Sequence, residues 1–137
     1  MIVHLNKCRS FVSGDRVGLR EILHPAKRKL KIRYSLAHAT LKSGKSSIPH
    51  KLKVSEVYYI LEGRGKMRVD NITTIVRRSD TVYIAPNSIQ FIENTGKSKL
   101  KFLCIVDPAW RQRDEIICYA TPPAGKRDSP HSRTAPR

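Results

Sequence analysis

Short stretches in which apolar and polar residues alternate run through most of the chain. Residues 31–41 are one such stretch, because Tyr34, Leu36 and His38 share one face while Ala37 and Ala39 share the other. Further β-branched, aromatic or alternating runs cover residues 57–61, 66–69, 73–76, 81–85, 90–93 and 100–106. Turn residues at 62–65, 70–71 and 78–80 separate them, and Asn71 suits the left-handed backbone of a tight hairpin. Many short strands at regular spacing predict an all-β sandwich or barrel.

Helical patterns are scarce. Residues 15–23 predict a short turn or strand, and residues 107–115 predict one helical turn. The composition changes near the C-terminus, where the chain becomes basic, rich in proline and free of large apolar residues. We therefore expect one barrel domain over residues 1–118, including the N-terminal strands, and a tail over 119–137 that is disordered or lies against a partner.

Two polar motifs lie in the central part of the chain, separated by a turn-rich spacer. The first has Gly44, His50, Glu56 and Gly63 as its anchors, and the second runs from Ser79-Asp80 through Gln90 to Asn94. The spacing of the first motif is that of G-x5-H-x-H-x3-E-x6-G, the first signature of the cupin superfamily. The chain therefore resembles a small single-domain cupin of the cupin 2 conserved-barrel type over roughly residues 30–110.

This resemblance implies a single jelly-roll barrel (a double-stranded β-helix), a homodimer and one metal ion inside the barrel mouth. The chain departs from the family pattern at two ligand positions, because Leu52 and Gln90 stand where histidines are expected. Carried over position by position, the candidate metal ligands are His50, Glu56 and Gln90. An imidazole, a carboxylate and an amide oxygen suit a divalent ion such as Fe, Mn, Ni, Co or Zn.

Two further side chains are candidates for proton transfer. His38 belongs to one face of the alternating run at 31–41, and one face of that run must line the barrel, so His38 is a possible ligand, base or wall residue. Tyr58 is expected to point inward together with Glu56, because alternate residues of a strand share a face. Trp110 is a weaker candidate, as a lid or a dimer anchor.

The function expected from these residues is a metal-dependent isomerase, lyase or dioxygenase that coordinates a small oxygen-rich anion, such as a hydroxy acid, keto acid or sugar derivative. Arg33 and Lys51 would attract such an anion if they lie at the barrel mouth. A metal-free barrel remains open as the alternative. In it, Glu56 and Gln90 would hydrogen-bond each other and bind a small polar ligand without catalysis.

The formal net charge of +16 attracts anions in general. A basic nucleic-acid-associated protein is therefore a further alternative, although no helix-turn-helix, zinc-finger or RNP motif is present and nucleic acid is not expected as the partner. No apolar run approaches the length of about 20 residues of a membrane span, and the N-terminus lacks the features of a secretory signal. We expect a cytoplasmic protein that is not attached to a membrane.

Overall fold

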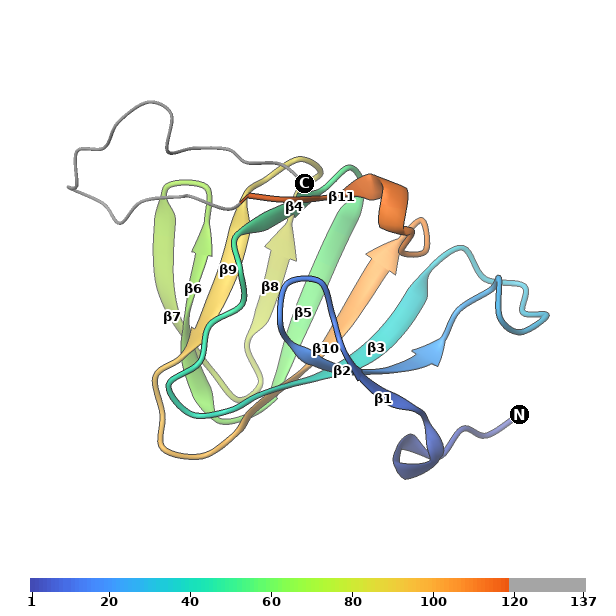
Figure 1. Cartoon of the computed structure of the whole chain (residues 1–137), viewed down its shortest axis with the longest axis horizontal. Helices are drawn as coiled ribbons and strands as arrows, with labels where there is room; N and C mark the ends of the chain where they lie inside the picture. The colour runs from blue at the N-terminus through green and yellow to red at the C-terminus, as the bar shows by residue number, and fades with distance from the viewer. Residues whose placement is uncertain (119–137) are drawn as a thin grey trace.

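The computed structural model describes residues 1–118, which form two antiparallel sheets packed face to face (Figure 1). The larger sheet has the order β1-β2-β3-β10-β5-β8, and the smaller has the order β11-β4-β9-β6-β7. The strands of the larger sheet are β1 (Ser10–Val12), β2 (Gly18–Leu23), β3 (Ser35–Leu41), β10 (Leu100–Asp107), β5 (Ser55–Glu62) and β8 (Thr81–Ile84). Those of the smaller sheet are β11 (Glu115–Ile117), β4 (His50–Leu52), β9 (Gln90–Asn94), β6 (Arg64–Val69) and β7 (Ile72–Arg77). The prediction of an all-β jelly roll is confirmed.

Helical structure within residues 1–118 is limited to two 3-10 turns, Leu5–Lys7 and Gln112–Asp114. The second turn lies inside the segment that the sequence predicts as one helical turn. Within the same part of the chain, no helix is long and apolar enough to cross a membrane. The predicted tail at 119–137 lies outside the described residues, and the division into barrel and tail stays a prediction.

Two tight connections join neighbouring strands of the barrel. Gly63, between β5 and β6, has φ +85°, and a Cβ there would lie 2.6 Å from the Lys99 carbonyl oxygen, so the position requires glycine. The β6–β7 hairpin turns at residues 70–71 as predicted, but Asp70 takes the positive φ of 52° rather than Asn71. Aspartate also tolerates this conformation. The Asp70 side chain accepts a hydrogen bond from the Ile89 amide, which ties the hairpin to the start of β9.

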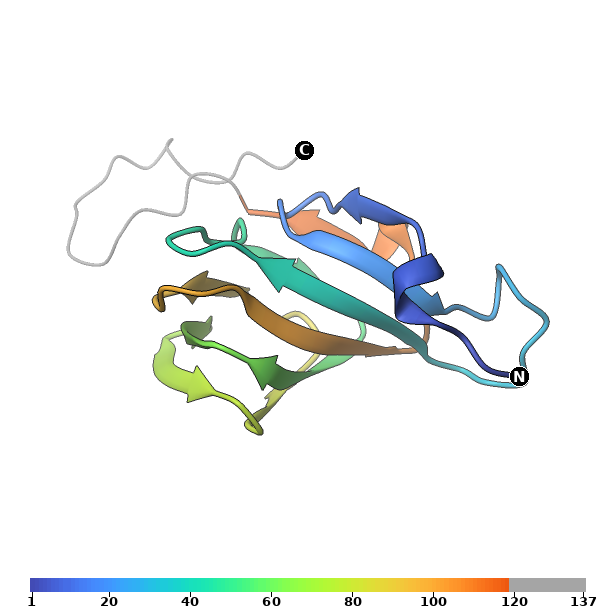
Figure 2. The same cartoon turned by 90° about the horizontal axis from the view of Figure 1, so that it is seen from below.

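Strand alternation divides the apolar residues between the core and the outer faces. The core between the sheets contains Ile60, Met67, Ile84, Ile92, Leu100 and Phe102, none of them more than 2% exposed. These side chains fill one half of the barrel. The N-terminal strands β1 and β2 and the C-terminal strand β11 come together on the same side of the molecule, as Figure 2 shows. Their meeting encloses the remaining part of the interior, where the polar residues gather.

Candidate functional site

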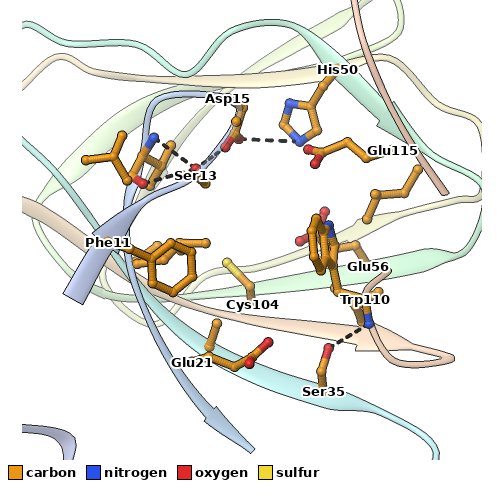
Figure 3. Close-up of a pocket in the computed structure, with 18 of the residues that line it drawn as sticks. Phe11, Ser13, Asp15, Glu21, Ser35, His50, Glu56, Cys104, Trp110 and Glu115 are labelled. Carbon is orange, nitrogen blue, oxygen red and sulfur yellow. Dashed lines mark hydrogen bonds and ion pairs between the residues drawn. The ribbon is translucent and has the colours of Figure 1, made fainter. Parts of the chain in front are cut away.

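A cavity of about 260 Å³ lies in the polar half of the barrel (Figure 3). The larger sheet contributes small side chains from β3, namely Ser35, Ala37 and Ala39, and these leave room for the cavity. The smaller sheet contributes His50 and Leu52 from β4. The β1–β2 loop closes over the opening and is held there because the Ile48 amide donates to the Asp15 carbonyl oxygen at 2.8 Å. We call this space the barrel cavity.

A chain of three buried side chains crosses the wall of the barrel cavity. Gln90 donates from Nε2 to Glu56 Oε1 at 2.9 Å, and the Tyr58 hydroxyl donates to Gln90 Oε1 at 2.9 Å. Gln90 reaches this position from the other sheet, where it lies opposite His50 in the register of β9 and β4. The predicted inward direction of Tyr58 is confirmed, since Tyr58 is 4% exposed whereas its neighbour Tyr59 is 38% exposed.

Burial controls the protonation of Glu56. Loss of hydration raises the pKa of its carboxyl group from the usual 4.5 to about 7, against the opposing effects of His50 and the Gln90 hydrogen bond. Among residues 1–118, only its Oε1 atom has a hydrogen-bond partner, so Oε2 is left for a ligand in the cavity. A carboxyl group with a pKa close to neutral both donates and accepts protons under physiological conditions.

His50 lies between a backbone carbonyl group and a buried carboxyl group. Its Nδ1 atom lies 2.8 Å from the Ile48 carbonyl oxygen, which only accepts, so Nδ1 carries hydrogen. Its Nε2 atom lies 3.5 Å from Asp15 Oδ2. His50 and Asp15 are therefore neighbouring buried polar groups at the cavity wall.

Glu115 completes the polar wall. The sequence analysis did not single it out, because it is brought here by the pairing of β11 with β4, in which Glu115 lies opposite Leu52. Figure 3 shows its carboxyl group directed toward the His50 ring. Burial raises the pKa of Glu115, whereas the nearby His50 and a hydrogen bond from the Trp110 side chain lower it. Asp15 and Glu115 are the functional candidates that strand alternation alone did not reveal.

The face of β3 that turns toward the cavity is the one without His38, so the possible role of His38 at the cavity is not supported by its position. Ser35, Ala37 and Ala39 line the barrel cavity, and His38 lies on the opposite face of β3 beside Arg20 and Lys101. Burial lowers the pKa of His38, and Lys101 and Arg20 lower it further. The physical reason is that the cavity requires small side chains at this wall, and only the serine and alanine face provides them. His38 has no route to a ligand in the cavity.

Of the predicted metal ligands, His50 and Glu56 line the cavity and Gln90 does not, and all three make hydrogen bonds to protein groups. No set of three or more His, Cys, Asp or Glu side chains in residues 1–118 is placed to hold a metal ion. The Gln90 amide directs N–H at Glu56 and its oxygen at the Tyr58 hydroxyl, so the group that faces Glu56 is a donor and not a metal-ligating oxygen. Leu52 supplies no donor. In this arrangement the donor set does not fit a resident metal, and the predicted site of His50, Glu56 and Gln90 stays a prediction.

Three comparisons place the chain among known proteins. Residues 37–106 match the family described as "Cupin domain". A protein of Methanocaldococcus jannaschii named "Uncharacterized protein MJ1618" is 40% identical over 113 residues, which are 82% of this chain and 90% of that protein. A crystal structure described as a predicted oxalate decarboxylase from Thermotoga maritima aligns with a TM-score of 0.69 at 24% identity, covering 79% of this chain and 99% of the other. A Cupin 2 conserved barrel domain protein from Salinispora arenicola aligns with a TM-score of 0.69 at 15% identity, covering 82% and 90%. The likeness to the two solved structures concerns the fold.

Proposed function

The chain belongs to the cupin family, and we propose that it binds a small polar organic molecule in the barrel cavity through hydrogen bonds and proton exchange, without a resident metal. The observation that carries this proposal is Glu56, a buried carboxyl group with a pKa of about 7 and one oxygen left for a ligand. The binding-barrel alternative raised by the sequence, in which Glu56 and Gln90 hydrogen-bond each other, corresponds to this hydrogen-bond pattern. A ligand hydroxyl or amine would donate to Glu56 Oε2.

The chemistry that this wall supplies is proton transfer. Glu56 faces the cavity from β5, and the His50–Asp15 pair faces it from β4 and the β1–β2 loop. Glu56 would exchange a proton with the bound ligand, and the neighbouring His50 imidazole is a second group able to accept or donate one, as isomerisation and elimination require. The metal-dependent isomerase, lyase or dioxygenase predicted by the resemblance would need a metal that this donor set does not fit.

Filling the cavity tests the proposal. We expect Ala37→Phe to abolish the thermal stabilisation that a bound small molecule gives to metal-free protein, because Ala37 lines the cavity. A ligand at 100 times its Kd stabilises the wild type by roughly 2.7 kcal/mol. The matched control is His38→Phe, one residue along the same strand and outside the cavity, which should retain the full shift. Differential scanning fluorimetry of a small-molecule library in the presence of a chelator measures both. Equal shifts in the two variants would contradict the assignment to this cavity.

The predicted homodimer has a candidate interface on the outer face of the larger sheet. Register places Leu36, Ile105, Val57 and Tyr83 in one apolar row across β3, β10, β5 and β8. Leu103 and Tyr59 are paired in the next row. The exposed face of an antiparallel sheet is ordinarily polar, so an apolar face supports a partner. We infer that a second copy of the chain covers it.

Tyr59 lies near the middle of this face and is 38% exposed. We expect Tyr59→Lys to weaken the dimer by roughly 30-fold in Kd, as a buried interface tyrosine worth about 2 kcal/mol would. The matched control is Ile75→Lys on the exposed strand β7 of the other sheet, where Ile75 is 50% exposed. Sedimentation equilibrium gives both constants. A monomeric wild type, or equal weakening by Ile75→Lys, would refute the interface.

A further inference from the structure

The barrel cavity has a charge opposite to that of the whole protein. Its lining includes four carboxyl groups, those of Asp15, Glu21, Glu56 and Glu115. Only two lining residues carry basic side chains, Arg9 and Lys27, and both are exposed. Lys27 already forms an ion pair with Glu21 at 2.6 Å, and Arg9 lies over the Phe11 ring at 5.2 Å. The ionisable groups that remain inside the cavity are therefore the His50 imidazole and three carboxyl groups, those of Asp15, Glu56 and Glu115.

For the side chains around His50 alone, and with Asp15 and Glu115 ionised, a protonated His50 beside a neutral Glu56 still leaves two carboxylates facing one imidazolium. Asp15 and Glu56 are each 7% exposed, so water screens this charge weakly. An anion entering the cavity would be repelled, whereas a cation would replace the missing positive partner.

Apart from two serines, the rest of the lining is apolar and aromatic. Phe11, Leu52 and Phe102 form part of it, and the Trp110 side chain lies close enough to Glu115 to lower the pKa of that carboxyl group. An aromatic ring next to a carboxylate is a favourable environment for an organic cation, because the ring face and the carboxylate both attract positive charge. The same rings would cover an apolar body attached to that cation.

We propose that the barrel cavity binds an organic ammonium compound, with the charged amine held by Glu56, Glu115 and Asp15 and its apolar body against Trp110 and Phe11. This inference rests on the proposed function, since it names the class of ligand for the same cavity. It replaces the small anion that the net charge of +16 and the family resemblance led us to expect. Arg33 and Lys51, the residues expected to attract that anion, do not line the cavity, and Arg33 instead pairs with Asp107 at 3.1 Å.

A matched set of three probes tests the class. The probes are 2-phenylethylamine, 2-phenylethanol and phenylacetate, which have similar bodies and carry positive, zero and negative charge at neutral pH. Trp110 is the single tryptophan of the chain, so its fluorescence reports occupancy of the cavity directly. In a chelating buffer, we expect the amine to bind roughly tenfold or more tightly than the alcohol, and phenylacetate to bind most weakly.

Removing one carboxylate tests the residues. Glu115→Gln keeps an oxygen to accept the Trp110 hydrogen bond but loses the charge, so the amine should lose roughly tenfold in affinity while the alcohol changes little. The control is Glu62→Gln, an equal change of charge on an exposed residue outside the cavity, which should alter neither. Ala37→Phe should abolish all binding detected by Trp110.

The outcomes separate this inference from the proposed function. If the alcohol or phenylacetate binds as tightly as the amine, the ammonium class is wrong and the proposed function stands. If the amine is preferred but Glu115→Gln and Glu62→Gln act alike, the assignment of the charged group to these carboxylates is wrong. If no probe binds and the small-molecule library also gives no stabilisation, both proposals fail.

Discussion

A variant carrying both Leu52→His and Gln90→His is expected to bind a divalent metal ion about 100-fold or more tightly than the wild type. His50 and Leu52 both line the barrel cavity from β4, and Gln90 lies opposite His50 in the neighbouring strand β9. The two substitutions would place three imidazoles beside the Glu56 carboxylate, which is the donor set of the cupin signature that this chain lacks. They also remove the amide that now donates to Glu56 and accepts from Tyr58.

Isothermal titration with Ni²⁺ and Zn²⁺ measures this gain. The control is the pair Lys51→His and Phe91→His, the next residues on the same two strands, which do not line the cavity. The control variant adds the same number of imidazoles, so any nonspecific affinity of surface histidines appears in both. A wild type that already binds as tightly as the double variant would show that the amide hydrogen bonds do not prevent metal binding.

Glu56→Gln is expected to remove about 3 kcal/mol of the loss in unfolding free energy that the wild type undergoes between about pH 4.5 and pH 8. The carboxyl group has a folded-state pKa of about 7 against 4.5 ordinarily, so the folded protein retains a proton that the unfolded chain releases. The stability that this proton represents is fully present below about pH 4.5 and is lost as the pH rises toward and through 7. Glutamine is neutral throughout and still offers an oxygen to the Gln90 amide, so the variant should not show this loss.

Urea unfolding of both proteins at several pH values between about 4.5 and 8 gives the difference in unfolding free energy. We expect this difference to shift in favour of Glu56→Gln as the pH rises, because the groups facing Glu56, namely His50, Asp15 and Glu115, are present in both proteins. Glu62→Gln, on the exposed end of β5, serves as the control and should parallel the wild type. Parallel curves for Glu56→Gln and the wild type would mean that Glu56 ionises normally in the fold.

The fold could be predicted from the sequence where alternation is sustained. The strands β5, β9 and β10 lie where the pattern places them, and Glu56 and Tyr58 share the inward face as expected. The strands that the pattern did not indicate are β1, β4 and β11, each three residues long, because so short a segment shows no period. They are held by pairing with strands distant in sequence, such as β11 with β4.

The site was predicted in part for the same reason. His50, Glu56 and Gln90 were singled out as candidates through the family resemblance, whereas Asp15 and Glu115 reach the cavity only through the β1–β2 loop and the late strand β11. Alternation also could not decide which face of β3 turns inward, because both faces carry apolar residues. The sequence analysis expected an anionic ligand because the net charge of the chain is positive. Net charge mainly reflects surface residues, whereas acidic side chains outnumber basic ones in the cavity lining.

The central claim is that the barrel cavity binds a small molecule without a metal. The most direct measurement is NMR mapping of bound fragments on isotopically labelled protein. The spectra are recorded first in excess chelator and then after addition of a diamagnetic divalent ion such as Zn²⁺. The account predicts that the Trp110 indole and the amides of Ser35 and Ala37 shift on binding in chelator, and that Zn²⁺ leaves the affinity unchanged. Shifts at these residues that arise only after a metal is added would contradict it.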